Sequence, residues 1–205
     1  HAIIQNAGGQ NCIIVCGGAN QCVTQEQIRD TLADFGPGDW LLLQNEVSNV
    51  PFAMEEAKRR GMTVAFNASP ITEELLSYPL ELVDCFLINE VEGKALSCVQ
   101  SDDFSVILEA LAVRFPKATI VLTVGEAGVL YREGVCTLQH GCYPVHAVDT
   151  TAAGDTFCGY FLSCLSKGLE AGEALEIASK ARAIAVSRHG AVPSIPHWDE
   201  VIAFK

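Results

Sequence analysis

The sequence has 205 residues, of which 49% are hydrophobic and 19% charged, so it is long and apolar enough to bury a sizeable core. Its formal net charge of −12 argues against nucleic acid and anionic membranes as partners, because like charges repel. No apolar run approaches the roughly 18 residues that a membrane-spanning helix needs.

Short apolar runs alternate with amphipathic segments along the chain. The predicted strands cover residues 11–16, 39–44, 62–67, 84–88 and 119–124, followed by a hairpin over 129–140 that turns at Glu133-Gly134 and an extended run over 143–148. The predicted helices cover 24–35, 49–60, 90–98, 102–115, 154–167, 172–188 and 197–204, with one short helix after Pro70 and loops at 17–20 and 125–128. This alternation predicts an α/β fold, a mostly parallel sheet with helices on both faces, as one domain over residues 1–205.

Nine cysteines are present, an odd number without a C-x-x-C pair, which argues against a disulfide framework and a zinc ribbon. The simplest interpretation is that they are reduced and buried, which predicts a reducing compartment, the cytoplasm. It applies to the cysteines in apolar segments, namely Cys12, Cys16, Cys85, Cys98, Cys158 and Cys164. The five scattered histidines indicate no metal site.

Polar residues follow the predicted strands, at the edge where open parallel sheets bind ligands. This edge has carboxylates, amides and glycines but no clustered lysines or arginines, so a phosphate there needs backbone N–H groups, a helix dipole and a divalent cation. The residues are Gly17–Asn20, Gln44–Glu46, Asn67, Asn89–Glu92, Thr123–Gly125 and Asp149–Asp155.

The stretch from Asp149 to Asp155 reads DTTAAGD and precedes a long helical pattern. The small residues from Ala152 to Gly154 let an oxyanion approach the backbone, and the helix adds its positive end. Asp155 beside a phosphate does not suit plain anion binding, but it suits a base that accepts a proton from an attacking hydroxyl. The alternative is that Asp149 only caps a turn and Asp155 only caps a helix.

Asn89 and Glu92 are spaced i and i+3 at a predicted helix start. One interpretation is that they position Mg²⁺ through water. The other, which these two residues alone favour, is an ordinary N-cap with a glutamate at the third helical position. The motifs of P-loop, Rossmann, nucleophile-elbow and zinc-protease sites do not occur in the sequence.

The segment VDTTAAGDTFCG, residues 148–159, resembles the C-terminal signature of the phosphofructokinase B-type, or ribokinase-like, sugar kinases. The segments LLLQNE, NASP, LINEVEG, VLTVGEAGV and AIAVSRHGAVPSIP follow the order and spacing of that family, so the resemblance covers nearly all of the chain. It implies a Rossmann-like three-layer sandwich and ATP-dependent phosphorylation of a sugar, D-ribose at its 5-hydroxyl, with Mg²⁺ and a monovalent cation, usually K⁺.

The resemblance also implies roles for individual positions. Asp155 matches the catalytic base, Glu46 an acid near the sugar hydroxyls, and Glu92 an acid that helps to place Mg²⁺ indirectly. The anion hole matches Ala152, Ala153 and Gly154. The nucleotide contacts match Asn89, Thr123, Val124, Gly125, Glu126, Ala127, Gly128, Gly154 and Ser179. The loops that hold K⁺, largely by backbone carbonyls, match Asp149, Thr151, Ala185, Arg188, Gly190 and Ser194.

Two departures from the family stand out. Ser179 falls where the family has His or Asn near adenine. At the front, neither Gly8-Gly9 nor Gly17-Gly18 has the context of the family's sugar-binding Gly-Gly motif, and Gly17–Asn20 resembles a Gly-Ala-Asn segment instead. We therefore expect the N-terminal strands, the small β-lid and most of the sugar site to be missing, and a homodimer through that lid stays open.

Three functions remain open. The first is a ribose kinase with ATP and the sugar as its small-molecule partners. The second is another kinase of the family, for fructose, a sugar acid or a nucleoside; Glu46 disfavours the sugar acid, because two negative charges would meet. The third is a non-catalytic module that binds nucleotide without sugar turnover.

Overall fold

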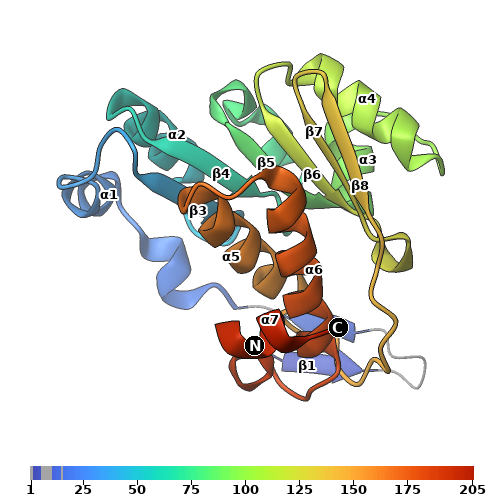
Figure 1. The fold of residues 1–205 in the computed structure, drawn as a ribbon. Helices are drawn as coiled ribbons and strands as arrows, with labels where there is room; N and C mark the ends of the chain where they lie inside the picture. The colour runs from blue at the N-terminus through green and yellow to red at the C-terminus, as the bar shows by residue number, and fades with distance from the viewer. Residues whose placement is uncertain (1, 6–10, 15) are drawn as a thin grey trace. The chain divides into compact units, whose positions relative to one another are not determined.

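The protein is described here by a computed structural model of residues 2–5, 11–14 and 16–205 (Figure 1). Two compact units make up the chain. Unit 1 comprises residues 1–123 and 131–137, and unit 2 comprises residues 124–130 and 138–205. The expectation of one domain over 1–205 stays a prediction.

A six-stranded sheet in the order β3-β4-β5-β6-β7-β8 is the main feature of the chain. Its strands are β3 (Trp40–Gln44), β4 (Thr63–Asn67), β5 (Cys85–Asn89), β6 (Thr119–Thr123), β7 (Val129–Glu133) and β8 (Cys136–His140). The first four are parallel and in register, with Gln44 opposite Asn67 and Asn89 opposite Thr123. The β7–β8 turn lies at Gly134-Val135, one residue later than predicted. The expected α/β class with a mostly parallel sheet is confirmed.

The helices of unit 1 are α1 (Gln25–Thr31), α2 (Val50–Arg59), α3 (Glu90–Ser97) and α4 (Phe104–Arg114), with short 3₁₀ turns η1 (Gly18–Cys22), η2 (Glu74–Ser77) and η3 (Leu80–Leu82). The helix α2 packs on β3 and β4, α3 on β5, and α4 on β6. Met54, Phe66, Phe86, Leu111 and Ile120 are at most 1% exposed, so the core of this unit lies between the parallel strands and these helices.

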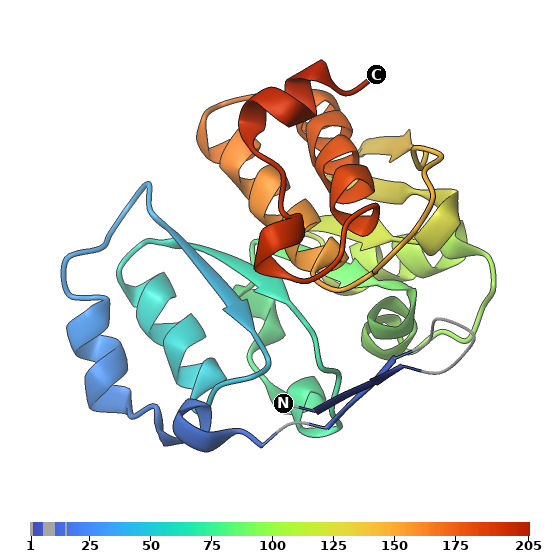
Figure 2. The same cartoon turned by 90° about the horizontal axis from the view of Figure 1, so that it is seen from below.

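Unit 2 contains the turn η4 (Gly125–Ala127), the long helices α5 (Ala153–Ser166) and α6 (Ala171–Val186), η5 (Val192–Ser194) and α7 (Trp198–Ala203). Figure 2 shows α5, α6 and α7 side by side, and both α5 and α7 pack on α6. Inside α5, the rings of Phe157 and Phe161 stack with centroids 5.9 Å apart. Residues 143–148 form no strand of a sheet, and their extended conformation stays a prediction.

The predicted strand over 11–16 is shorter and has a different partner. The observed strand β2 (Asn11–Ile14) pairs antiparallel with β1 (Ala2–Gln5) in a separate two-stranded sheet. An antiparallel pair needs only a short connection, whereas a parallel strand needs a crossover. Residues 17–20, read as a loop at a strand end of the parallel sheet, therefore lie outside that sheet and begin η1. Gly8 and Gly9 lie outside the described residues.

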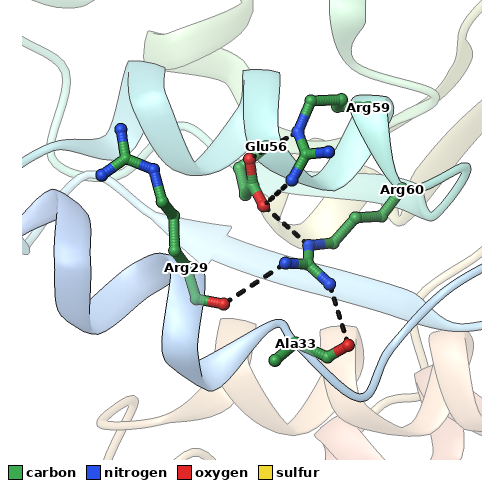
Figure 3. A network of polar contacts seen from close by, with 5 residues as sticks. All are labelled: Arg29, Ala33, Glu56, Arg59 and Arg60. Carbon is green, nitrogen blue, oxygen red and sulfur yellow. Dashed lines mark hydrogen bonds and ion pairs between the residues drawn. The ribbon is translucent and has the colours of Figure 1, made fainter.

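The helix α1 ends at Thr31, four residues before the predicted end. The guanidinium of Arg60, the C-cap residue of α2, donates to the carbonyl oxygens of Arg29 and Ala33, at 3.4 and 2.9 Å, and so binds the carbonyl end of α1 (Figure 3). Glu56 is 5% exposed and accepts hydrogen bonds from Arg59 and Arg60, which hold its pKa at about 2. This Glu56 network links α1 to α2.

The cysteine prediction holds for three of the residues it covered. Cys85, Cys158 and Cys164 are buried, whereas Cys16 and Cys98 are exposed, so the prediction is wrong for those two. Cys98 leaves the core because it ends α3 in a left-handed conformation, with φ of 58°. The side chain of Cys12 lies outside the described residues. Among the described helices, none is long and apolar enough to cross a membrane.

Candidate functional site

The start of α5 has an unusual backbone. Its N-cap residue Ala152 has φ of 58°, a left-handed conformation that costs a non-glycine residue of order 1–3 kcal/mol. Gly154 follows as the second residue of α5, and glycine has a low helix propensity. A Cβ on Gly154 would have no atom within 4 Å, so packing within the described chain does not require glycine. Both features are typical of a loop shaped for a ligand.

Asp155 is the third residue of α5 and is exposed. The N-cap position belongs to Ala152, so the helix does not use Asp155 as its N-cap residue. The N–H group of Ala153 points back to the carbonyl oxygen of Thr150, at 3.3 Å. Asp155 as the base, and Ala152 to Gly154 as an anion hole, stay predictions.

Asp149 ties two loops of unit 2 together. Its carboxylate accepts hydrogen bonds from the backbone N–H groups of Thr151, at 2.9 Å, and Gly190, at 3.0 Å. Hydrogen bonds from Thr151 and Gly190 lower the pKa of Asp149 to about 2. Asp149 therefore caps a turn, as the structural alternative expected, and also joins residues 149–151 to the loop after α6.

The end of α6 and the loop after it contain the other residues predicted to hold a monovalent cation. The N–H of Arg188 donates to the carbonyl oxygen of Ala185, and the Arg188 guanidinium pairs with Glu200. That pairing, with the backbone N–H of His197, lowers the pKa of Glu200 to about 2. The buried Ser194 donates its hydroxyl to the carbonyl oxygen of Ala191. Backbone carbonyl oxygens suit a monovalent cation, and a K⁺ site formed by these residues stays a prediction.

A pocket of about 510 Å³ lies within unit 2. Four residues predicted to contact nucleotide line it, namely Gly125, Glu126, Gly128 and Ser179. Two more, Val124 and Ala127, form the hydrogen bonds of the turn between them. Gly128 is required structurally, because a Cβ there would lie 2.1 Å from the carbonyl oxygen of His140.

Sequence reasoning missed several residues of this pocket. The most informative are Tyr143, Arg182 and Val186. Arg182 and Val186 follow Ser179 by three and seven residues on α6, so helical spacing from Ser179 was a usable signal for them. Tyr143 comes from a segment without regular structure, and only the tertiary structure brings it to the pocket.

The remaining predicted residues lie in unit 1. Asn89 caps α3, and its side-chain oxygen accepts from the N–H groups of Val91 and Glu92, both at 2.9 Å. Glu92 accepts in return from the backbone N–H and the side-chain amide of Asn89, both at 2.9 Å. Together these hydrogen bonds form a capping box, which is the interpretation that the spacing of Asn89 and Glu92 favoured in the sequence. Thr123 lies opposite Asn89 in the ladder of β5 and β6.

Glu92 is 4% exposed, and its burial raises its pKa. Both carboxylate oxygens accept hydrogen bonds from Asn89, so the box fixes the orientation of Glu92, and its role in placing Mg²⁺ through water stays a prediction. Within the described ranges, no group of three or more His, Cys, Asp or Glu side chains could hold a metal ion. Glu46 is exposed after β3, and its carbonyl oxygen accepts from the side chain of Gln21 at 3.3 Å.

Comparison with known proteins gives consistent results. A family model described as the pfkB family of carbohydrate kinases matches residues 1–198. The ribokinase of Haemophilus influenzae is 35% identical over 212 residues, which cover 99% of this chain and 68% of that protein.

Two solved structures agree with the fold. The crystal structure of ribokinase from Thermotoga maritima is 37% identical with a TM-score of 0.78, over 98% of this chain and 67% of that one. The structure of Arabidopsis thaliana ribokinase complexed with ribose and ATP is 27% identical with a TM-score of 0.80, and the match again covers 98% of this chain and 67% of that one. The chain thus spans about two thirds of the length of these relatives.

Proposed function

The chain belongs to the pfkB family of carbohydrate kinases, and from this premise we propose that it transfers the terminal phosphoryl group of ATP to the 5-hydroxyl of D-ribose. The observation that carries the proposal is the start of α5. A left-handed alanine, a glycine that packing does not require and an exposed aspartate follow one another there.

In this proposal Asp155 accepts the proton of the sugar hydroxyl while the hydroxyl oxygen forms a bond to the γ-phosphorus. The bond between that phosphorus and the oxygen of ADP breaks, and ADP leaves with the electron pair. The N–H groups from Ala152 to Gly154, that of Ala153 after it leaves the carbonyl oxygen of Thr150, stabilise the charge on the transferring group, helped by the positive end of α5. Glu46 contacts the sugar hydroxyls.

The nucleotide occupies the pocket lined by Gly125, Glu126, Gly128 and Ser179, and the similarity to a ribokinase solved with ATP supports this. Asn89 and Thr123 contribute from the ends of β5 and β6, with Val124 and Ala127 shaping the turn. Mg²⁺ supplies charge neutralisation on the phosphates, and Glu92 orients it through water. Thr151 before α5, and Ala185, Arg188, Gly190 and Ser194 at and after the end of α6, would hold K⁺, and Asp149 joins these two segments.

The test is a substrate panel with the full chain. We expect ADP release with ribose to exceed that with fructose, a nucleoside or a sugar acid, and to increase when K⁺ replaces a large organic cation. Phosphorus NMR of the product identifies the 5-phosphate. ATP binding without turnover of any sugar would instead identify a nucleotide-binding module. We also propose a reducing compartment, the cytoplasm, because the nine cysteines of the sequence include no C-x-x-C pair.

A further inference from the structure

Arg182 differs from every other arginine of the chain. Of the seven arginines, six have a partner: Arg29 lies over the ring of Phe52, and the others bind side-chain or backbone acceptors, namely Arg59, Arg60, Arg114, Arg132 and Arg188. Arg182 is half-buried and lines the pocket of unit 2, yet among residues 2–5, 11–14 and 16–205 it has no hydrogen bond or ion pair. In a chain with a net charge of −12, an unpaired guanidinium that lines a pocket is available to bind a ligand, because its N–H donors have no other partner there.

The position of Arg182 along α6 indicates which part of a nucleotide it meets. The pocket follows α6 from Ser179 to Val186, a rise of about 10 Å. The carbonyl oxygen of Val186 accepts from the N–H groups of Val148 and Asp149, which ties the loop before α5 to that end of α6. In the proposed function this loop binds the phosphates, so Ser179 lies toward the base. Arg182 lies three residues from Ser179 and four from Val186, and helical side chains tilt toward the N-terminus of their helix, so its side chain leans toward Ser179 and the base.

A second charged residue lines the same pocket. Glu126 in η4 is exposed and, within the described residues, has no hydrogen bond or ion pair either. The nearby Lys180 is not available in the same way, because it pairs with Glu176 at 2.8 Å and lies 5.9 Å from the ring centroid of Tyr143. The pocket is thus lined by one unpaired guanidinium, that of Arg182, and one unpaired carboxylate, that of Glu126.

Guanine matches these two groups better than adenine does. A guanidinium only donates, and the O6 and N7 atoms of guanine are two adjacent acceptors for it. Adenine presents N7 beside its N6 amino group, which is a donor and opposes a second bond. The N1–H and N2 amino groups of guanine are donors that a carboxylate accepts.

We propose that Arg182, aided by Glu126, binds the base of the phosphoryl donor and makes GTP a donor beside ATP. The inference rests on the proposed function for the direction of the nucleotide in the pocket. It assigns Arg182 as a residue that sets donor specificity.

The test compares kcat/KM for GTP and ATP at saturating ribose. In the wild type we expect the GTP value to lie within about tenfold of the ATP value. Arg182→Ala lowers the GTP value by about tenfold to a hundredfold and the ATP value by much less. Arg182→Lys keeps the positive charge but loses the pair of parallel N–H donors. We therefore expect it to lower kcat/KM for GTP as Arg182→Ala does. Arg132→Ala, which removes a guanidinium paired with Glu109, is the matched control and leaves the GTP/ATP ratio unchanged.

Calorimetry with GDP and ADP separates this proposal from the proposed function. If no sugar is phosphorylated with either donor, the sugar-kinase proposal fails, and the effect of Arg182→Ala on GDP affinity still decides the role of Arg182. A wild-type preference for ATP greater than about tenfold would overturn the inference, and so would an equal loss for both nucleotides in Arg182→Ala. Circular dichroism establishes that each variant folds.

Discussion

Asp155 is the proposed general base of the phosphoryl transfer. Asp155→Asn keeps the size of the side chain and removes its ability to accept a proton. We expect kcat with ribose to fall by about 10²–10⁴-fold, because that is the usual contribution of a general base, while ADP affinity stays unchanged. A coupled assay and calorimetry measure the two quantities.

The matched control is Asp199→Asn, in the first turn of α7, which removes a similarly exposed helix-start carboxylate. It should retain wild-type turnover. Wild-type turnover in Asp155→Asn would show that Asp155 is not the general base.

Asp149 makes a prediction about pH. Its pKa of about 2 lies below the ordinary aspartate value of about 3.9, so the folded state binds the proton less readily than the unfolded state. Its stabilising contribution is fully present above about pH 4 and is lost as the pH falls toward 2. We expect Asp149→Asn to lower the melting temperature at pH 6. The difference in melting temperature between the variant and the wild type should disappear between pH 4 and pH 2. A gap that stays constant over that range contradicts the assignment.

At the scale of elements, the Glu56 network connects two helices through one buried carboxylate (Figure 3). Glu56→Gln leaves Arg59 and Arg60 without their anion and loosens the bond from Arg60 to the carbonyl end of α1. We expect the melting temperature to fall by several degrees at neutral pH. Glu55→Gln, the exposed neighbour on α2, is the control and should melt like the wild type. Equal melting of the two variants would show that the network contributes little.

Most elements could be predicted because their signals are local. Thr24 accepts from the N–H of Gln27 at 3.1 Å, and the Asn89–Glu92 box starts α3, both within four residues of sequence. The errors have a different origin. The carbonyl end of α1 is bound by Arg60, the C-cap residue of another helix, and β2 pairs with β1 in a sheet of its own. Neither contact is visible in the residues that form the element.

At the scale of the whole molecule, nucleotide binding should protect one group of segments. We expect ADP to slow amide hydrogen exchange at residues 124–130, 141–154 and 179–186, which line or support the pocket. The helix α2 (Val50–Arg59), which contributes no residue to this pocket, serves as the internal reference and should exchange unchanged. Equal slowing in α2 and in α6 would indicate general stabilisation instead of occupancy of this pocket.

The sequence by itself determined the α/β class, most helix starts and the family signature around Asp155. Those features depend on hydrophobic period and capping over a few residues, and on a motif that is contiguous in the chain. Only the tertiary structure decided that Asp149 bonds Gly190, 41 residues away, and that Tyr143 and Arg182 share a pocket with Gly125. Such contacts depend on how helices and loops that are far apart in the sequence pack together. The residue pattern of one segment does not specify which other segment it contacts.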